Sequence, residues 1–122
     1  MSRKPSEGPR KPLSLPVIHI LLALSEGPLH GYAIKRGVED RTNGAIRLGP
    51  GTLYEAIQRL LDAGLIREAT TGAEEPGNGQ EAQRRYYMLT DRGWDVLRAE
   101  LRQLNALVEH ARANPKLRKG LA

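Results

Sequence analysis

Residues 50–64 read Pro50-Gly51-Thr52-Leu53-Tyr54-Glu55-Ala56-Ile57-Gln58-Arg59-Leu60-Leu61-Asp62-Ala63-Gly64, and they decide the fold. Pro50 suits the first position of a helix, where a missing N–H costs nothing. Gly64 suits the position just past a helix end. The stretch therefore predicts one short helix with both boundaries defined.

The two faces of this predicted helix differ in chemistry. Apolar residues recur at helical spacing and form one stripe: Leu53, Ile57, Leu60 and Leu61. Outside the stripe stand hydroxyl, carboxylate, amide and guanidinium groups: Thr52, Tyr54, Glu55, Gln58 and Arg59. Most of these groups hydrogen-bond to phosphates and base edges. Taken alone, the helix favours the simpler interpretation of a core helix with a mixed surface, and the segments that follow it in the chain reverse that preference.

Length and charge limit the possibilities. A chain of 122 residues suits one domain with tails, and its net charge is +5. Residues 1–12 carry +3 and residues 112–122 carry +4, so residues 13–111 sum to −2. Overall basicity favours a polyanionic partner. Because the excess lies in the tails, the folded part has to bind nucleic acid through a local patch.

The cysteine count and hydropathy point to the cytoplasm. The sequence has no cysteine, which excludes disulfides and thiolate metal sites and fits a reducing compartment. Its longest apolar run, residues 15–24, is far short of a membrane span, and no signal peptide is recognisable. We expect a soluble cytoplasmic protein with no membrane partner.

Two helices are predicted before residue 50. Ser14 is a good cap for an apolar helix that begins there and forms the centre of the core. A second short helix covers residues 30–40, with Lys35 and Arg36 facing outward. A turn follows, and residues 46–48 alternate like a very short strand. Two short helices, a connector and a helix with a polar outer face describe a helix-turn-helix.

After Gly64 the pattern changes to that of strands. Residues 65–69 and 84–89 alternate, and the segment between them is rich in Gly, Glu and Gln. This predicts a β-hairpin with a long tip, the wing of a winged helix-turn-helix. The predicted fold class is therefore mainly α with a small β-hairpin.

A long helix is predicted last, with Thr90 as its cap and Asp91 in its first turn. Apolar residues recur along it in a heptad pattern: Trp94, Leu97, Leu101, Leu104, Val108 and Ala111. Such a stripe needs a partner surface, and we expect a homodimer. Packing of the helix against its own domain is the alternative.

Four fragments in this order resemble the PadR family of bacterial transcriptional regulators. They are residues 29–34, residues 51–60, Gly64-Leu65-Ile66 and residues 84–93, and the resemblance covers about residues 13–111. It implies a winged helix-turn-helix that dimerises through its last helix and usually represses transcription. It also implies release by a small, often aromatic, ligand and a palindromic operator in double-stranded DNA.

The resemblance assigns roles by position. The DNA-binding residues would be Lys35, Arg36, Gly51, Thr52, Tyr54, Gln58, Arg59, Arg84 and Arg85, and dimerisation would use Leu97, Leu101, Leu104, Val108 and Ala111. Tyr86 and Tyr87 would divide between the exposed side and the core, and residues His30-Gly31-Tyr32 would be structural, with Gly31 allowing a tight entry to the second helix. Trp94 would either stack an aromatic effector or belong to the core.

The sequence departs from the family at two points. Gly49 stands where the third helix usually has a Ser or Thr cap, at a cost of a few tenths of a kcal/mol. The wing tip carries Glu74, Glu75 and Glu81 and no cation. We therefore expect this tip to bend away from DNA or to stay disordered.

The expected organisation has four parts. Residues 1–12 form a disordered basic arm, residues 13–89 the DNA-binding domain, residues 90–113 the dimerisation helix and residues 114–122 a flexible basic tail. An enzyme is not expected, because the three histidines are dispersed and no catalytic motif is present. No metal or other cofactor is indicated. The rival function is a winged-helix module that binds protein.

Overall fold

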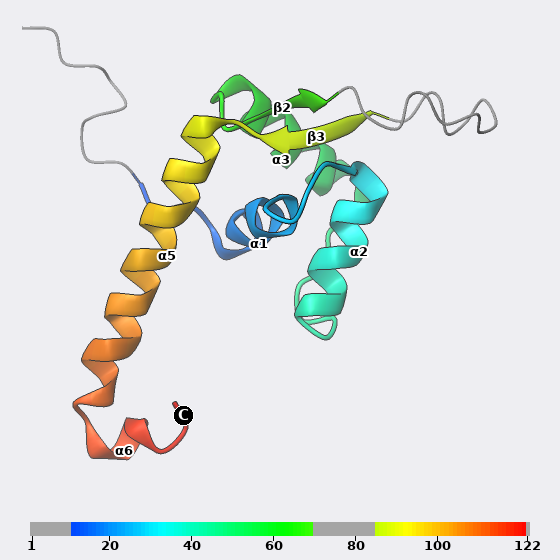
Figure 1. Cartoon of the computed structure of the whole chain (residues 1–122). Helices are drawn as coiled ribbons and strands as arrows, with labels where there is room; N and C mark the ends of the chain where they lie inside the picture. The colour runs from blue at the N-terminus through cyan, green and yellow to red at the C-terminus, as the bar shows by residue number, and fades with distance from the viewer. Residues whose placement is uncertain (1–10, 70–84, 122) are drawn as a thin grey trace, which may run out of the picture.

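The computed structural model describes residues 11–69 and 85–121 and has the expected winged-helix architecture (Figure 1). Helices make up most of it, together with a small antiparallel sheet. The elements in chain order are α1 (Leu15–Leu24), β1 (Leu29–His30), α2 (Gly31–Arg41), α3 (Pro50–Asp62), β2 (Ile66–Ala69), β3 (Tyr86–Leu89), α5 (Asp91–Arg112) and α6 (Pro115–Arg118).

Helix α1 forms the centre of the core, as predicted. The Ser14 hydroxyl accepts a hydrogen bond from the Val17 N–H at 3.4 Å and caps the helix. In Figure 1, α1 lies between α5 and α2, and it contacts both of them and β3. Its inner side chains are among the most deeply buried in the structure, with Ile20 and Leu21 fully inaccessible to solvent. The remaining elements are thus packed around one aliphatic helix.

The connector between α2 and α3 differs from the prediction, because residues 46–48 form no strand. Thr42 organises this segment: its hydroxyl donates to the Val38 carbonyl at 2.9 Å and accepts from the Ile46 N–H at 3.1 Å. Leu48 is buried in the core. The alternating pattern therefore arises from a loop that inserts apolar side chains, not from pairing with another strand.

The sheet has three strands in the order β1-β3-β2, and β1 was not predicted from the sequence. The hairpin of β2 and β3 is confirmed, with Ile66 opposite Leu89 and Ala69 opposite Tyr86. Strand β1 adds two residues on the other side of β3. A two-residue strand has no periodicity, which is why the sequence did not predict it. The expected wing tip lies outside the described residues.

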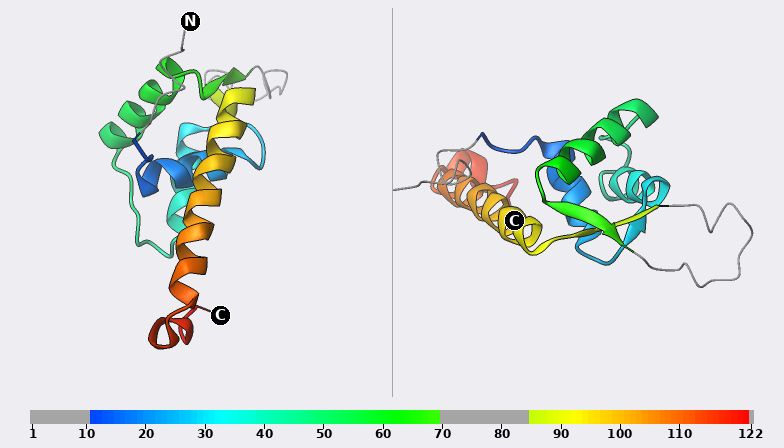
Figure 2. Two further views of the ribbon diagram at one scale, coloured as in Figure 1. Left: turned by 90° about the vertical axis from the view of Figure 1, so that its left-hand side faces the viewer. Right: turned by 90° about the horizontal axis from the view of Figure 1, so that it is seen from above.

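Helix α5 begins at the predicted cap, and its first half packs against the core. Val96, Leu97 and Glu100 are buried there. The Glu100 carboxylate accepts a hydrogen bond from the Leu13 N–H at 3.3 Å and so fixes the segment before α1. Figure 2 shows that the second half of α5 extends beyond the other elements. The helix therefore packs on its own domain through only part of its length.

The C-terminal segment also differs from the expected loose tail. Asn114 caps a short helix, α6, by accepting a hydrogen bond from the Lys116 N–H at 2.9 Å. Asn114 and Pro115 are common at the start of a helix, and here they begin a single turn.

Hydrogen bonds and a close backbone contact constrain the junction between α3 and α5. The Thr90 hydroxyl donates to the Gly64 carbonyl at 2.6 Å and accepts from the Gly93 N–H at 3.0 Å. The Thr90 N–H donates to the Leu65 carbonyl at 3.1 Å. A Cβ on Gly93 would overlap the Leu65 carbonyl oxygen, so only glycine fits there.

This overlap predicts the effect of Gly93→Ala. Because the obstacle is backbone and cannot rotate away, we expect the substitution to lower the free energy of unfolding by about 1–3 kcal/mol, measured by urea denaturation. Gly51→Ala is the matched control, since a Cβ at that helical glycine meets nothing within 4 Å. Equal stability of the Gly93 variant and the wild type would contradict the described packing.

Candidate nucleic-acid interface

Helix α3 presents the polar face that its sequence predicted. Gly49 occupies the cap position without a side-chain hydrogen bond, as expected. The apolar stripe of Leu53, Ile57 and Leu60 is buried. The proposed contact residues are all exposed: Gly51, Thr52, Tyr54, Gln58 and Arg59. A second macromolecule can therefore reach this face without rearrangement of the core.

Tyr54 lies on the side of α3 that faces α2. Tyr54 is 52% exposed. Its hydroxyl lies against Gly31, so a Cβ added to Gly31 would come within 2.6 Å of the Tyr54 Oη. Gly31 has no positive φ, so it is not needed for a tight turn. The expected role of Gly31 is thus corrected: its missing side chain makes room for Tyr54.

Helix α2 carries the two predicted basic residues, Lys35 and Arg36, and their interaction partners differ. The Lys35 ammonium pairs with the Glu39 carboxylate at 2.8 Å, and this hydrogen bond lowers the pKa of Glu39. Arg36 lies over the Tyr32 ring at 5.9 Å from the ring centre, and the Tyr32 hydroxyl raises the pKa of this guanidinium. Arg36 is therefore the available positive charge, whereas Lys35 is already paired.

Tyr32 was not among the predicted interface residues, although it is 54% exposed beside Arg36. The Tyr32–Arg36 spacing of one helical turn on an outward face was the available signal. His30 lies close by and caps α2, since its Nδ1 accepts a hydrogen bond from the Ala33 N–H at 3.2 Å. The structural role expected for His30 is consistent with this cap.

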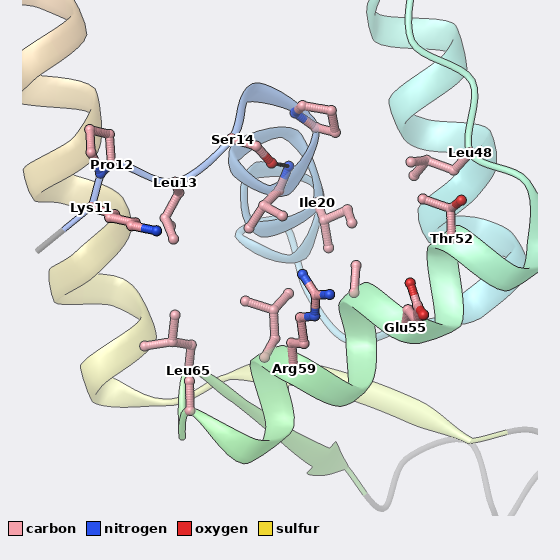
Figure 3. Close-up of a pocket in the computed structure, with 15 residues that line it drawn as sticks. Lys11, Pro12, Leu13, Ser14, Ile20, Leu48, Thr52, Glu55, Arg59 and Leu65 are labelled. Atoms are coloured by element: carbon pink, nitrogen blue, oxygen red, sulfur yellow. Dashed lines mark hydrogen bonds between the residues drawn. The ribbon is translucent and has the colours of Figure 1, made fainter.

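The remaining polar residues of α3 point in different directions. The Gln58 amide donates to the Asp62 carboxylate at 3.0 Å on the outward surface. Thr52 and Arg59 instead lie on the side facing α1, where both line a cavity (Figure 3). The sequence grouped these residues on one face, and the structure separates them into an α2 flank, an outward centre and an α1 flank.

Of the two wing arginines predicted to contact DNA, Arg84 and Arg85, the structure describes Arg85. Arg85 pairs with Glu68 across the hairpin at 3.1 Å, and its side chain is 71% exposed. Arg84 lies outside the described residues. Tyr86 is half-buried with its ring edge-on to His30, and Tyr87 is buried, which raises its pKa. Tyr87 therefore takes the core side, as one of the two tyrosines was expected to do, whereas Tyr86 is half-buried and not fully exposed. Arg67 on β2 is a further exposed cation.

The predicted dimerisation residues fall into two groups. Leu97 is buried in its own domain, and Leu104 packs partly against that core. Leu101 is 38% exposed and Trp94 is 40% exposed on the adjacent flank of α5, and Val108 and Ala111 are half-buried. Leu107, which the heptad pattern omitted, is 65% exposed. The apolar surface of α5 thus extends beyond what its own domain covers.

The described parts of the chain contain neither a metal-binding cluster nor a membrane-spanning helix. No group of three His, Asp or Glu side chains there could hold a metal ion. No helix in these ranges is long and apolar enough to cross a membrane.

Known structures share this fold. A PadR family transcription regulator from Clostridium difficile R20291 superposes with a TM-score of 0.66 at 24% identity, covering 82% of this chain and 97% of that one. A transcriptional regulator from Clostridium thermocellum gives 0.65 at 23% identity, covering 81% and 88%. Bacillus subtilis PadR in complex with operator DNA gives 0.61 at 26% identity, covering 75% of this chain and 48% of that one.

Sequence comparison agrees with the fold. A protein in transposon TN4556 of Streptomyces fradiae, described as an uncharacterized 37.1 kDa protein, is 39% identical over 88 residues. This match covers 72% of the present chain and 22% of that protein, so the chain spans about a fifth of its relative. The sequence profile of the Transcriptional regulator PadR-like family matches residues 20–99. The chain belongs to the PadR-like family of transcriptional regulators.

Proposed function

We propose that this protein is a sequence-specific DNA-binding regulator that inserts α3 into the major groove. The observation that carries the proposal is the exposed polar face of α3, flanked by Arg36 of α2 and Arg85 of the wing. Bacillus subtilis PadR, which is 26% identical to this chain, was crystallised with operator DNA. A helix N-terminus with free N–H groups also favours a phosphate near Gly51.

Within this proposal the residues divide their work by position. Gln58 at the outward centre of α3 reads base edges, Thr52 and Tyr54 contact phosphates or base edges from the two flanks, and Arg36 holds the flanking backbone. Lys35 assists only if the phosphate displaces Glu39, because the two side chains are paired. Arg59 reaches DNA when it turns away from the cavity beside α1. Arg84 contacts the neighbouring phosphates, and Arg85 joins it when a phosphate displaces Glu68, with which Arg85 is paired.

The proposed biological unit is a homodimer formed through α5. Trp94, Leu101 and Leu107 leave apolar surface exposed on this helix, and a second copy would cover it. Residues 13–89 then form the DNA-binding unit and residues 90–113 the dimerisation helix. A two-fold dimer favours a palindromic operator with half-sites about one helical turn apart. We further propose that the protein is a cytoplasmic repressor released by a small ligand, with Trp94 as one contact for an aromatic effector.

A protein-interaction module is the second candidate. Glu55 and Asp62 lie on the exposed side of α3, and Glu39 neutralises Lys35. These carboxylates weaken the attraction to phosphate and would suit a basic protein surface. The response of binding to salt separates the two functions, because phosphate contacts release counterions and protein contacts do not.

The first prediction concerns DNA binding. Fluorescence anisotropy with the duplex upstream of the protein's own gene should show binding that weakens steeply as salt increases, whereas a shuffled duplex should bind weakly. Arg36→Gln should reduce affinity about fivefold, or roughly 1 kcal/mol. Arg98→Gln on α5 is the matched control and should change little. Equal, weak binding to both duplexes would favour the protein-interaction module.

The second prediction tests how Gly31 positions Tyr54. A methyl group in Gly31→Ala would displace the Tyr54 ring, so affinity for the upstream duplex should fall several-fold. The fold should tolerate the change, because the obstructing atom is the end of a mobile side chain. In a Tyr54→Leu background the same substitution should cause no additional loss. If the two losses were additive, Gly31 would not act through Tyr54.

The third prediction concerns the dimer. Sedimentation at micromolar concentration should give a dimer for the wild type and a monomer for Leu101→Glu, because the new carboxylate would be buried between apolar helices. Gln103→Glu adds the same charge at another exposed position of α5 and should remain dimeric. A monomeric wild type would rule out dimerisation through α5.

A further inference from the structure

A cavity of about 490 Å³ lies on the α1 side of α3, away from the outward face of that helix. It is bounded by α3, by the start of α1 and by the segment from Lys11 to Ser14, as Figure 3 shows. The hydrogen bond from Leu13 to Glu100 holds this segment in place along one edge. Small-molecule sites typically occupy roughly 300–1,000 Å³, so the cavity has the size of a ligand site.

The wall of the cavity is mostly aliphatic. Val17 and Ile20 come from α1, Leu60 from α3 and Leu48 from the connector before it. None of the described residues that line the space is aromatic. A ligand there would bury apolar surface against aliphatic side chains and would gain nothing from ring stacking.

Two cations reach the same cavity from different elements. Arg59 extends from α3, and Figure 3 shows its guanidinium directed into the space between α1 and α3, whereas Lys11 lines the cavity from the segment before α1, on the side near α5. Among residues 11–69 and 85–121, neither forms an ion pair or a side-chain hydrogen bond. Glu55 and Thr52 line the opposite end. An anionic group beside Arg59 would find this guanidinium available for pairing.

We propose that this cavity binds a small carboxylate with a compact aliphatic body. The carboxylate would accept hydrogen bonds from the Arg59 guanidinium, which matches it in geometry, and the body would fill the space beside Val17 and Leu60. A further consequence rests on the proposed function: a bound carboxylate holds Arg59 on the α1 side and withdraws it from DNA. The ligand would thus weaken operator binding through a residue of α3 itself.

Calorimetry of the full chain without DNA tests the site independently of any regulatory role. The probe is octanoate, and we expect one site per chain. Octanamide, which has the same body without the charge, should bind at least about tenfold more weakly, as should octanoate to Arg59→Gln. Arg98→Gln lies outside the cavity and should bind octanoate like the wild type. Undiminished binding by octanamide or by Arg59→Gln would overturn the proposal.

A single-cysteine experiment locates the ligand. Because the sequence has no cysteine, Ala56→Cys places a unique thiol on the cavity wall, and Ala45→Cys provides an exposed control. Octanoate should slow alkylation of the first thiol by iodoacetamide and leave the second unchanged. Failure of octanoate to protect Ala56→Cys would overturn the site. A second outcome would also overturn the site: without octanoate, the Ala56→Cys thiol is alkylated slowly, and dilution of the protein accelerates the reaction. A second copy of the chain would then occupy the cavity.

Discussion

The hydroxyl of Thr90 joins the two helices on which the proposed function depends. It donates to the carbonyl of Gly64, just past the end of α3, and accepts from the N–H of Gly93, in the first turn of α5. One side chain therefore satisfies a backbone acceptor at one helix end and a backbone donor at the other. Gly93 lies so close to the Leu65 carbonyl that no side chain at position 93 fits between the two backbone segments. The orientation of α3 relative to α5 is consequently constrained by backbone groups together with one short side chain, that of Thr90.

Local chemistry made most of the fold predictable from the sequence. Ser14 and Thr90 cap helices where the sequence placed them, and Gly64 takes a positive φ of 77° just past α3. These features depend on a few neighbouring residues, so the sequence carries them directly. The burial of Leu53, Ile57 and Leu60 likewise follows from their spacing. The α1 core and the β2–β3 hairpin were predicted for the same reason.

The parts that the sequence did not predict depend on contacts between distant segments. Strand β1 exists only because β3 offers a free edge to Leu29 and His30. The direction of Arg59 depends on the space left by α1, and the reason for glycine at position 31 lies in the Tyr54 side chain. The sequence thus predicted which polar residues of α3 are exposed, but not how their side chains are arranged around the helix. Pairing of Lys35 with Glu39 could have been anticipated, since they are one helical turn apart.

The fixed junction at Thr90 has a consequence for a dimer built on α5. Thr90 and Leu104 are about 21 Å apart along the helix, because an α-helix rises 1.5 Å per residue. If the two α5 helices cross near Leu104, a rotation of each by about 5° would move each Thr90 by roughly 2 Å. Each α3 would follow as a rigid extension of its α5. The crossing angle of two helices would then set the spacing between two DNA-reading surfaces, and no change inside either domain would be required.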